Sequence, residues 1–362
     1  PGADAIVAVQ PGGVGERLAA AAGGGPALFA ALDAAARQRD VDVRYDHAAE
    51  RLLTDVVGRV IGVHCVNGEG NAVELYADHG VILCCGGYEY DEALKRDNLR
   101  TYPVYFYGNP GNTGDGVHMA QAVGASLWHM NQMIGRAIGH FELDTGGEVN
   151  VLISIGPPGY VITDRFGHRF ADEHGQAMLR HDFYYDLLLY DPVRNLRPRV
   201  PCFWFFDESR RRAGPLTLTH IGAPAVGLYD WSADNSVEIE RGWIATGDTI
   251  EEAARNAGVA DPTPAAATVA AYNQQCGEGG GDTFCRPSET LVALTEPPFY
   301  CVPLWPGGSN TTGGPRRNQH AQILDPFDEP IAGLYAAGEL GQPSGLLYPA
   351  DGSNLSAVSY TH

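Results

Sequence analysis

Two glycine turns near the end of the sequence carry residues whose types and spacing can do chemistry. Residues 333–337 form a short apolar run, and Gly338 and Glu339 follow it directly. This pattern predicts a buried strand that ends in a glycine turn, with a carboxylate able to accept hydrogen bonds from sugar hydroxyls. The second turn holds Ser353 and Asn354, which favour a helix N-terminus. Because such a terminus stabilises negative charge, the layout suits a reduced flavin ring.

Three further stretches support a flavin site. They lie at 81–88, 111–120 and 164–173 and read VILCCGGY, GNTGDGVHMA and DRFGHRFADE. With the late segment, they resemble the flavoprotein family of fumarate reductases, succinate dehydrogenase flavoprotein subunits and 3-ketosteroid 1-dehydrogenases. The four blocks follow the family order. The resemblance implies that FAD is the cofactor and that the turn at Gly338 lies beside the turn at Gly87, around one ligand.

The resemblance also implies which residues contact FAD. Backbone groups near Ala48 are expected to face the adenine, and Asp115 either contacts flavin hydroxyls or caps the helix that follows it. The whole set assigned to the cofactor is Ala48, Gly86, Gly87, Asn112, Thr113, Gly114, Asp115, Gly338, Glu339, Ser353, Asn354 and Leu355.

The opening strand and G-x-G-x-x-G turn of the family have no match at the start of this sequence. The nearest candidate, at 12–15, has the wrong spacing. The backbone amides of that turn hold the pyrophosphate of the dinucleotide, so we expect the 362-residue chain by itself to bind FAD weakly. The family's last helix is also cut short at His362. We expect an incomplete reading frame; a natural split protein whose partner supplies the missing segment is the alternative.

Composition fits a globular enzyme without a membrane span. Hydrophobic residues make up 44% of the 362 positions, and no apolar run approaches the ~20 residues that cross a bilayer. The net charge of -20, without a basic stripe, argues against nucleic-acid binding. Seven cysteines without a C-x-x-C pair are typical of a reducing, cytoplasmic compartment, and Cys84 and Cys85 are expected in the core. Histidine spacing predicts no metal site.

The resemblance implies an α/β fold with an α+β cap. Residues 1–127 and 299–362 would form an incomplete Rossmann-like FAD-binding domain, and 128–298 an inserted substrate-capping domain that excludes water from the flavin. Apolar spacing predicts helices at 25–39 and 116–125, a strand at 41–45 and a hairpin-like pair within 52–66. Helices are also predicted at 250–257 and 263–275, the first with a capping box of Thr249 and Glu252.

Several positions argue against a small dicarboxylate as substrate. Fumarate reductases of the family clamp it with His and Arg and deliver a proton from another Arg. In this sequence the position of the proton-delivering Arg holds Ala177, and the position of the substrate-binding His holds Ser309 or Asn310. The position of the clamping Arg falls near Ala350. Since these expected polar anchors are all missing, the resemblance favours a different substrate class.

The ketosteroid dehydrogenases fit the sequence better. Their Y-P-x-x-G motif matches residues 348–352, which implies that the Tyr348 hydroxyl and the Gly352 N–H bind the substrate carbonyl and stabilise the enolate. Tyr105 and Tyr107 lie where the family has an aromatic pocket wall and a helper tyrosine. The family's base, a Tyr, again falls on Ala177; the nearby alternatives left open are His174, Arg180, His181, Tyr184 and Tyr185.

The sequence thus indicates an FAD-dependent oxidoreductase that acts on CH–CH groups. It would transfer a hydride between flavin and a carbon adjacent to, or conjugated with, the carbonyl of a hydrophobic, ketosteroid-like substrate. The direction, desaturation or ene reduction, and the electron acceptor stay open. The alternatives are a fumarate reductase-like reductase of another unsaturated acid, and a non-catalytic fragment or subunit without FAD.

Overall fold

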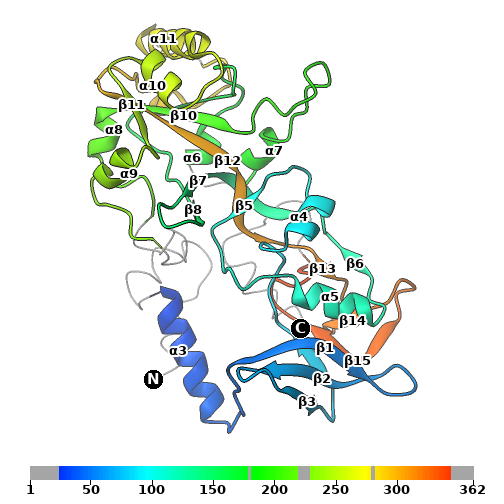
Figure 1. The fold of residues 1–362 in the computed structure, drawn as a ribbon. Helices are drawn as coiled ribbons and strands as arrows, with labels where there is room; N and C mark the ends of the chain where they lie inside the picture. Colours follow the sequence, from blue (N-terminus) through cyan, green and yellow to red (C-terminus); the bar gives the residue numbers. More distant parts are fainter. Residues whose placement is uncertain (1–23, 178–180, 219–228, 279–281, 344–362) are drawn as a thin grey trace. The chain divides into compact units, whose positions relative to one another are not determined.

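The computed structural model describes residues 24–177, 181–218, 229–278 and 282–343, and the chain divides into two compact units (Figure 1). Unit 1 comprises Pro1–Leu99, Pro110–Met133 and Asn310–His362; unit 2 comprises Arg100–Asn109 and Ile134–Ser309. The division expected from the sequence has its boundaries at 127/128 and 298/299 and keeps residues 100–109 in the first domain. Those residues join unit 2 because the short strand within them pairs with its central sheet.

Unit 1 contains an antiparallel sheet made from consecutive strands in the order β1-β2-β3. The strands are β1 (His47–Thr54), β2 (Val60–Asn67) and β3 (Ala72–Tyr76). The pairing of β1 with β2 confirms the hairpin predicted within residues 52–66. The other elements of this unit are α3 (Gly24–Arg37), α4 (Glu92–Asn98), α5 (Asp115–Ala122), β6 (Leu127–Trp128) and β13 (Gly314–Pro315).

A second sheet of unit 1, ordered β14-β15-β4, joins segments that are far apart in the sequence. Strand β4 (Val81–Leu83) runs parallel to β15 (Pro330–Ala336), with Leu334 opposite Val81, while β14 (Gln322–Leu324) is antiparallel to β15. Because β4 and β15 are parallel, the chain leaves both strands at the same edge of the sheet. The glycine turns that follow the two strands therefore begin side by side.

Unit 2 is built on a seven-stranded sheet with β12 (Phe299–Thr311) at its centre. The main path is β8-β7-β12-β10-β9, and β5 and β11 also pair with β12. These strands are β5 (Tyr105–Phe106), β7 (Met133–Glu142), β8 (Glu148–Val151), β9 (Val161–Thr163), β10 (Cys202–Asp207) and β11 (Ala245–Gly247). The helices are α6 (His174–Ala177), α7 (Phe183–Asp186), α8 (Glu208–Arg212), α9 (Ser236–Glu240), α10 (Ile250–Asn256), α11 (Pro262–Glu278) and the 3₁₀ helix η3 (Ser288–Thr290).

Strand β10 shows that this sheet is covered on both faces. All six of its residues are buried, and alternate side chains enter two different hydrophobic clusters. Trp204 and Phe206 pack into one cluster, whereas Phe203 and Phe205 join the other, which includes residues of α10 and α11. Half of the predicted capping box of α10 is confirmed, because the Thr249 hydroxyl accepts the Glu252 N–H at 3.1 Å. The Glu252 carboxylate accepts from the N–H of Asp248, one residue before the cap, at 2.8 Å.

Two predictions about unit 1 are wrong. Residues 41–45 form no strand, because Val41, Val43 and Tyr45 are all exposed and bury no apolar face. The two cysteines after β4 are not core residues, since Cys84 is exposed and Cys85 is only half-buried. The predicted helices at 25–39 and 116–125 correspond to α3 and α5.

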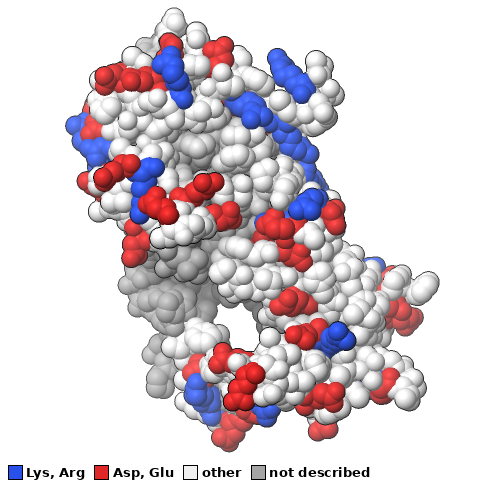
Figure 2. Space-filling view, in the orientation of Figure 1, with Lys and Arg blue, Asp and Glu red and all other residues white. Residues whose placement is uncertain are grey.

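Acidic side chains are spread over both units on the face shown in Figure 2, with basic side chains between them. They do not gather into one patch on that face. Among the described helices, none is long and apolar enough to cross a membrane.

Candidate functional site: a buried carboxyl cluster in unit 1

Four segments of unit 1 meet at the edge where β4 and β15 end. The turn at Gly87 accepts a hydrogen bond from Gly114 N, at the start of α5, over 3.2 Å. A Cβ built on Gly87 would lie 2.2 Å from Thr311 Oγ1, at the end of β12, and 2.8 Å from Glu339 Oε1. The expectation that the turns at Gly87 and Gly338 lie together is therefore confirmed. Only glycine allows these side chains to approach so closely.

Glu339 is the acid of the late glycine turn, and it is held from two sides. The Asn112 amide donates to its Oε1 at 3.3 Å, and the backbone of Gly87 also hydrogen-bonds to it. Burial and the neighbouring Glu89 carboxyl raise the pKa of Glu339 well above its ordinary range. The predicted cofactor residues Gly86, Gly87, Asn112 and Glu339 thus lie within one cluster.

Glu89 is the member of this cluster that sequence reasoning missed. It is fully buried, and its Oε1 accepts from Thr311 Oγ1 at 2.7 Å and from the Thr311 backbone N–H. Within the described part of the chain, its Oε2 has no hydrogen-bond partner. The available signal was an acid two residues after the Gly86-Gly87 turn, next to the fully buried Tyr88. Hereafter Glu89, Glu339, Asn112 and Thr311 are called the carboxyl cluster.

The start of α5 decides between two roles expected for Asp115. Gly114 is the N-cap, with a left-handed backbone and no side-chain capping bond. Asp115 is the first helical residue, and it accepts from Thr113 Oγ1 at 3.1 Å. The alternative that Asp115 caps the helix is therefore wrong, and its contact with flavin hydroxyls stays a prediction.

Other predicted site residues lie away from this cluster or outside the described residues. Ala48 is exposed on β1, where it pairs with Val66. Gly338 follows β15 with a φ of 74°. Five predicted residues lie outside the described residues: Tyr348, Gly352, Ser353, Asn354 and Leu355.

The two tyrosines expected to wall the substrate pocket belong to unit 2. The Tyr105 ring stacks on His140 with centroids 3.6 Å apart, and Trp305 meets Tyr105 edge-on at 5.8 Å. Tyr107 is half-buried, and its backbone N–H donates to Gly308 O at 3.1 Å. These contacts form an aromatic group on β5, β7 and β12.

The candidate bases differ in how readily they take up or release a proton. Burial and the nearby Arg136 lower the pKa of His181 to about 4, so its ring is neutral at neutral pH. Burial raises the pKa of Tyr184, whose hydroxyl is buried without a described partner, and also that of Tyr185. Arg180 lies outside the described residues.

Arg136 is itself a feature that sequence reasoning missed. Its side chain is buried on β7, and one guanidinium nitrogen lies 3.1 Å and 3.2 Å from the two ring nitrogens of His181. Among the described residues, no carboxylate pairs with Arg136, and its Nε has no hydrogen-bond partner. A buried cation without an anion is costly, so this position suits an anionic group.

The acidic block at 164–173 has a structural role in unit 2. Arg169 binds Glu173 at 2.7 Å and Asp282 at 2.6 Å, and Arg286 lies 3.5 Å from Glu173. All four side chains are nearly fully buried. We call these residues the arginine-paired network.

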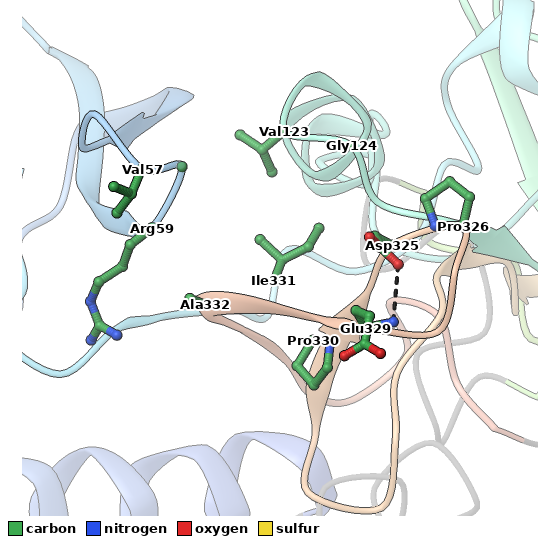
Figure 3. A pocket seen from close by; sticks show the side chains of 11 residues that line it. Val57, Arg59, Val123, Gly124, Asp325, Pro326, Glu329, Pro330, Ile331 and Ala332 are labelled. Carbon is green, nitrogen blue, oxygen red and sulfur yellow. Dashed lines mark hydrogen bonds between the residues drawn. The ribbon is translucent and has the colours of Figure 1, made fainter.

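A pocket of about 400 Å³ lies elsewhere in unit 1, at the tip of the β1–β2 hairpin (Figure 3). The C-terminal end of α5 and the β14–β15 turn complete its lining. Asp325 accepts from Glu329 N at 3.0 Å within that turn, and Arg59 donates to His79 O at 2.9 Å. None of the predicted site residues lines this pocket.

Comparison with known families gives a match along nearly the whole chain, because residues 8–355 match the model of the FAD binding domain. The chain belongs to this family. The predicted FAD cofactor is thereby confirmed for the family to which the chain belongs.

Three curated relatives cover most of this chain. They are 4-oxocyclohexanecarboxylate 2-dehydrogenase of Sinomonas cyclohexanicum (27% identical; 92% of this chain, 58% of the relative), a probable fumarate reductase of Shewanella frigidimarina (27%; 87% and 48%) and 3-oxosteroid 1-dehydrogenase of Mycolicibacterium smegmatis (28%; 92% and 60%). The predicted resemblance to fumarate reductases and ketosteroid dehydrogenases is confirmed. The chain spans between 48% and 60% of the length of these relatives.

A solved structure shows the same fold. It is a 3-ketosteroid delta1-dehydrogenase from Sterolibacterium denitrificans in complex with 1,4-androstadiene-3,17-dione, and it superimposes with a TM-score of 0.75. The alignment covers 92% of this chain and 61% of that one at 24% identity. The general α/β class is therefore confirmed, while the capping role of the inserted segment stays a prediction.

Proposed function

We propose that the complete protein is an FAD-dependent oxidoreductase that transfers a hydride between flavin and a carbon adjacent to, or conjugated with, a substrate carbonyl. The substrate is a hydrophobic, ketosteroid-like ketone, and the reaction is desaturation or its reverse, ene reduction. The observation that carries the proposal is the carboxyl cluster at the common edge of β4 and β15, in a chain of the FAD binding domain family.

The carboxyl cluster fits the hydroxyl-rich part of the cofactor. Glu339 offers acceptor oxygens to sugar hydroxyls, and the Asn112 amide that holds it fixes their direction. When bound, FAD supplies the atom that accepts or donates the hydride. The start of α5, with Thr113 and Asp115, lies beside the same turn and provides further polar contacts.

The substrate side rests on residues matched by their order in the sequence. In this proposal, Tyr348 donates its hydroxyl and Gly352 its N–H to the substrate carbonyl, which stabilises the enolate as the α-proton leaves. In this proposal, Tyr105 on β5 and Tyr107 just after it form an aromatic wall beside the segment 128–298, which acts as the substrate-capping domain. Two relatives are named for ketone substrates, which supports this class of compound.

Replacing Tyr348 by Phe tests the proposal directly. The ring remains, so the complete protein should keep its flavin, while single-turnover flavin reduction should slow by ~100-fold or more because one carbonyl donor is lost. Tyr45→Phe, at an exposed position, is the control and should leave the rate unchanged. Unchanged reduction in Tyr348→Phe would refute the role of its hydroxyl, and loss of flavin would make the residue structural.

Arg136 favours a second candidate function, the reduction of an unsaturated acid. A buried guanidinium without a described carboxylate partner is suited to a substrate carboxylate. If so, Arg136→Met should raise the KM for an unsaturated acid by about 100-fold, the worth of one charge-assisted hydrogen bond pair, with little effect on kcat. Arg136→Lys should restore part of the loss. Equal activity of Arg136→Met on acids and on uncharged ketones would eliminate this candidate.

A further inference from the structure

Glu89 and Glu339 are two buried carboxyl groups that lie beside each other, and no described residue places a cation between them. A Cβ built on Gly87 would lie 2.4 Å from Glu89 Oε1 and 2.8 Å from Glu339 Oε1, so the two oxygens flank the same small space. In the part of the chain that the structure describes, the donors that reach the pair are all neutral. They come from the backbone and hydroxyl of Thr311, the amide of Asn112 and the backbone of Gly87.

The charged groups of the surrounding elements have partners of their own. Asp91, which caps α4, accepts from Leu94 N and from the His118 ring of α5. Asp115 of α5 accepts from Thr113. Arg317 donates to the carbonyls of Ala336 and Gly338, just before Glu339 in the chain. No described cation therefore binds either carboxyl of the pair.

The unsatisfied Oε2 of Glu89 is a second sign that this pair lacks a compensating charge. Two carboxyl groups that are buried beside the same small space favour uptake of a proton, because repulsion between their charges and loss of hydration both disfavour the doubly ionised form. Glu89 Oε2 has no donor among the described residues, so no other described group compensates its charge, and a proton held between the two carboxyls is the neutralisation that their proximity allows. The raised pKa of Glu339 agrees with this reading.

We propose that Glu89 is a positioning residue for the cofactor: it holds Glu339 as half of a carboxyl pair that shares one proton. The pair then presents one negative charge, rather than two, to the sugar hydroxyls of FAD, whose pyrophosphate is already anionic. This inference rests on the proposed function, since it assigns a ligand to the carboxyl cluster. It predicts that loss of the shared proton at high pH weakens both the folded chain and its affinity for FAD.

The sign of the stability effect follows from proton linkage. A carboxyl whose pKa is raised on folding binds its proton in the native chain at pH values where the unfolded chain has released it. The contribution of this proton to the free energy of unfolding is therefore fully present below the ordinary pKa of Glu, about 4.3. It is lost as the pH rises toward the raised pKa of the folded chain. Glu89→Gln removes the shared proton, because an amide donates permanently to an ionised Glu339.

Urea unfolding of the flavin-free 362-residue chain measures this proton without FAD. Between about pH 6 and about pH 9, the midpoint of the native chain should fall, whereas that of Glu89→Gln should stay level. Glu50→Gln changes an exposed carboxyl on β1 and should follow the native chain. Parallel profiles for the native chain and Glu89→Gln would overturn the proposal.

Two further measurements cover the case in which Glu89→Gln does not fold. Glu339→Gln removes the same proton from the other half of the pair and should also flatten the profile. Carboxyl ¹³C titration of the native chain should show one Glu that titrates above about pH 7. If every Glu titrates below about pH 5.5, no proton is shared and the proposal fails.

FAD binding to the complete protein separates this inference from the proposed function. Above the titration of the pair, the Kd of the native protein for FAD should rise by up to about tenfold per pH unit, while that of Glu89→Gln should not change. A shared proton in a complete protein that does not bind FAD would refute the proposed function alone. FAD binding with the same pH profile in both proteins would refute the inference alone.

Discussion

The two units neutralise buried carboxylates in opposite ways. In unit 2, Glu173 and Asp282 are bound by Arg169, with Arg286 close by, so the negative charges are balanced by guanidinium groups. In unit 1, the described donors to Glu89 and Glu339 are all neutral, and in our proposal a shared proton takes the place of the cation. A guanidinium occupies the carboxylate oxygens with its own N–H donors. A shared proton occupies fewer of them, so the remaining carboxyl oxygens can accept hydrogen bonds from the hydroxyls of a ligand.

This difference gives the two clusters opposite responses to pH. Burial alone would raise the pKa of Asp282, but the hydrogen bonds and charge of Arg169 outweigh burial and lower it. The arginine-paired network therefore weakens as the pH falls, while the carboxyl cluster weakens as the pH rises. At acid pH the free energy of unfolding should therefore fall because unit 2 is weakened. At alkaline pH it should fall because unit 1 is weakened.

The largest effect is expected from breaking the arginine-paired network. Arg169→Met leaves Glu173 and Asp282 buried without their main cation, so the free energy of unfolding should drop by about 3–5 kcal/mol. Urea unfolding followed by circular dichroism measures this loss. Arg255→Met, which removes an exposed pair with Glu251, should cost less than about 1 kcal/mol. Equal losses in the two variants would show that burial does not govern the network.

A smaller effect sharpens the comparison of pH responses. Asp282→Asn keeps part of the contact with Arg169 and should cost on the order of 1–2 kcal/mol near neutral pH. The stability contributed by a lowered carboxyl pKa is present above its ordinary value, about 3.9, and lost as the pH falls through the lowered one. The difference between Asp282→Asn and the native chain should therefore vanish in strong acid. If the difference in the free energy of unfolding between Asp282→Asn and the native chain stays constant down to about pH 2, Asp282 is not an ionised partner of Arg169.

The order of the sequence blocks was enough to predict the family, the α/β class and the meeting of the turns at Gly87 and Gly338. Local patterns also gave correct predictions where neighbouring residues set the structure, as in the cap that Thr249 provides to the Glu252 N–H. They failed at residues 41–45, where the alternating apolar side chains have no surface to pack against.

Local sequence patterns could not predict contacts between residues that are far apart in the chain. Glu89 meets Thr311 across 222 positions, and Arg136 reaches His181 across 45. Neither residue stands out by type or spacing, because burial and partners are set by the folded sheets rather than by near neighbours. The buried carboxyl pair and the buried guanidinium of Arg136, which has no carboxylate partner among the described residues, become visible only once the strands that bring these side chains together are known.

Anaerobic mixing of the purified, complete protein with a saturated, hydrophobic cyclic ketone tests the central claim most directly. The account predicts that the protein carries FAD and that the oxidised flavin absorbance bleaches in a single turnover, with the unsaturated ketone as product. The reverse reaction, reoxidation of the reduced flavin by the unsaturated ketone, would equally support it. A flavin that neither compound reduces nor reoxidises, or a complete protein without flavin, would contradict it.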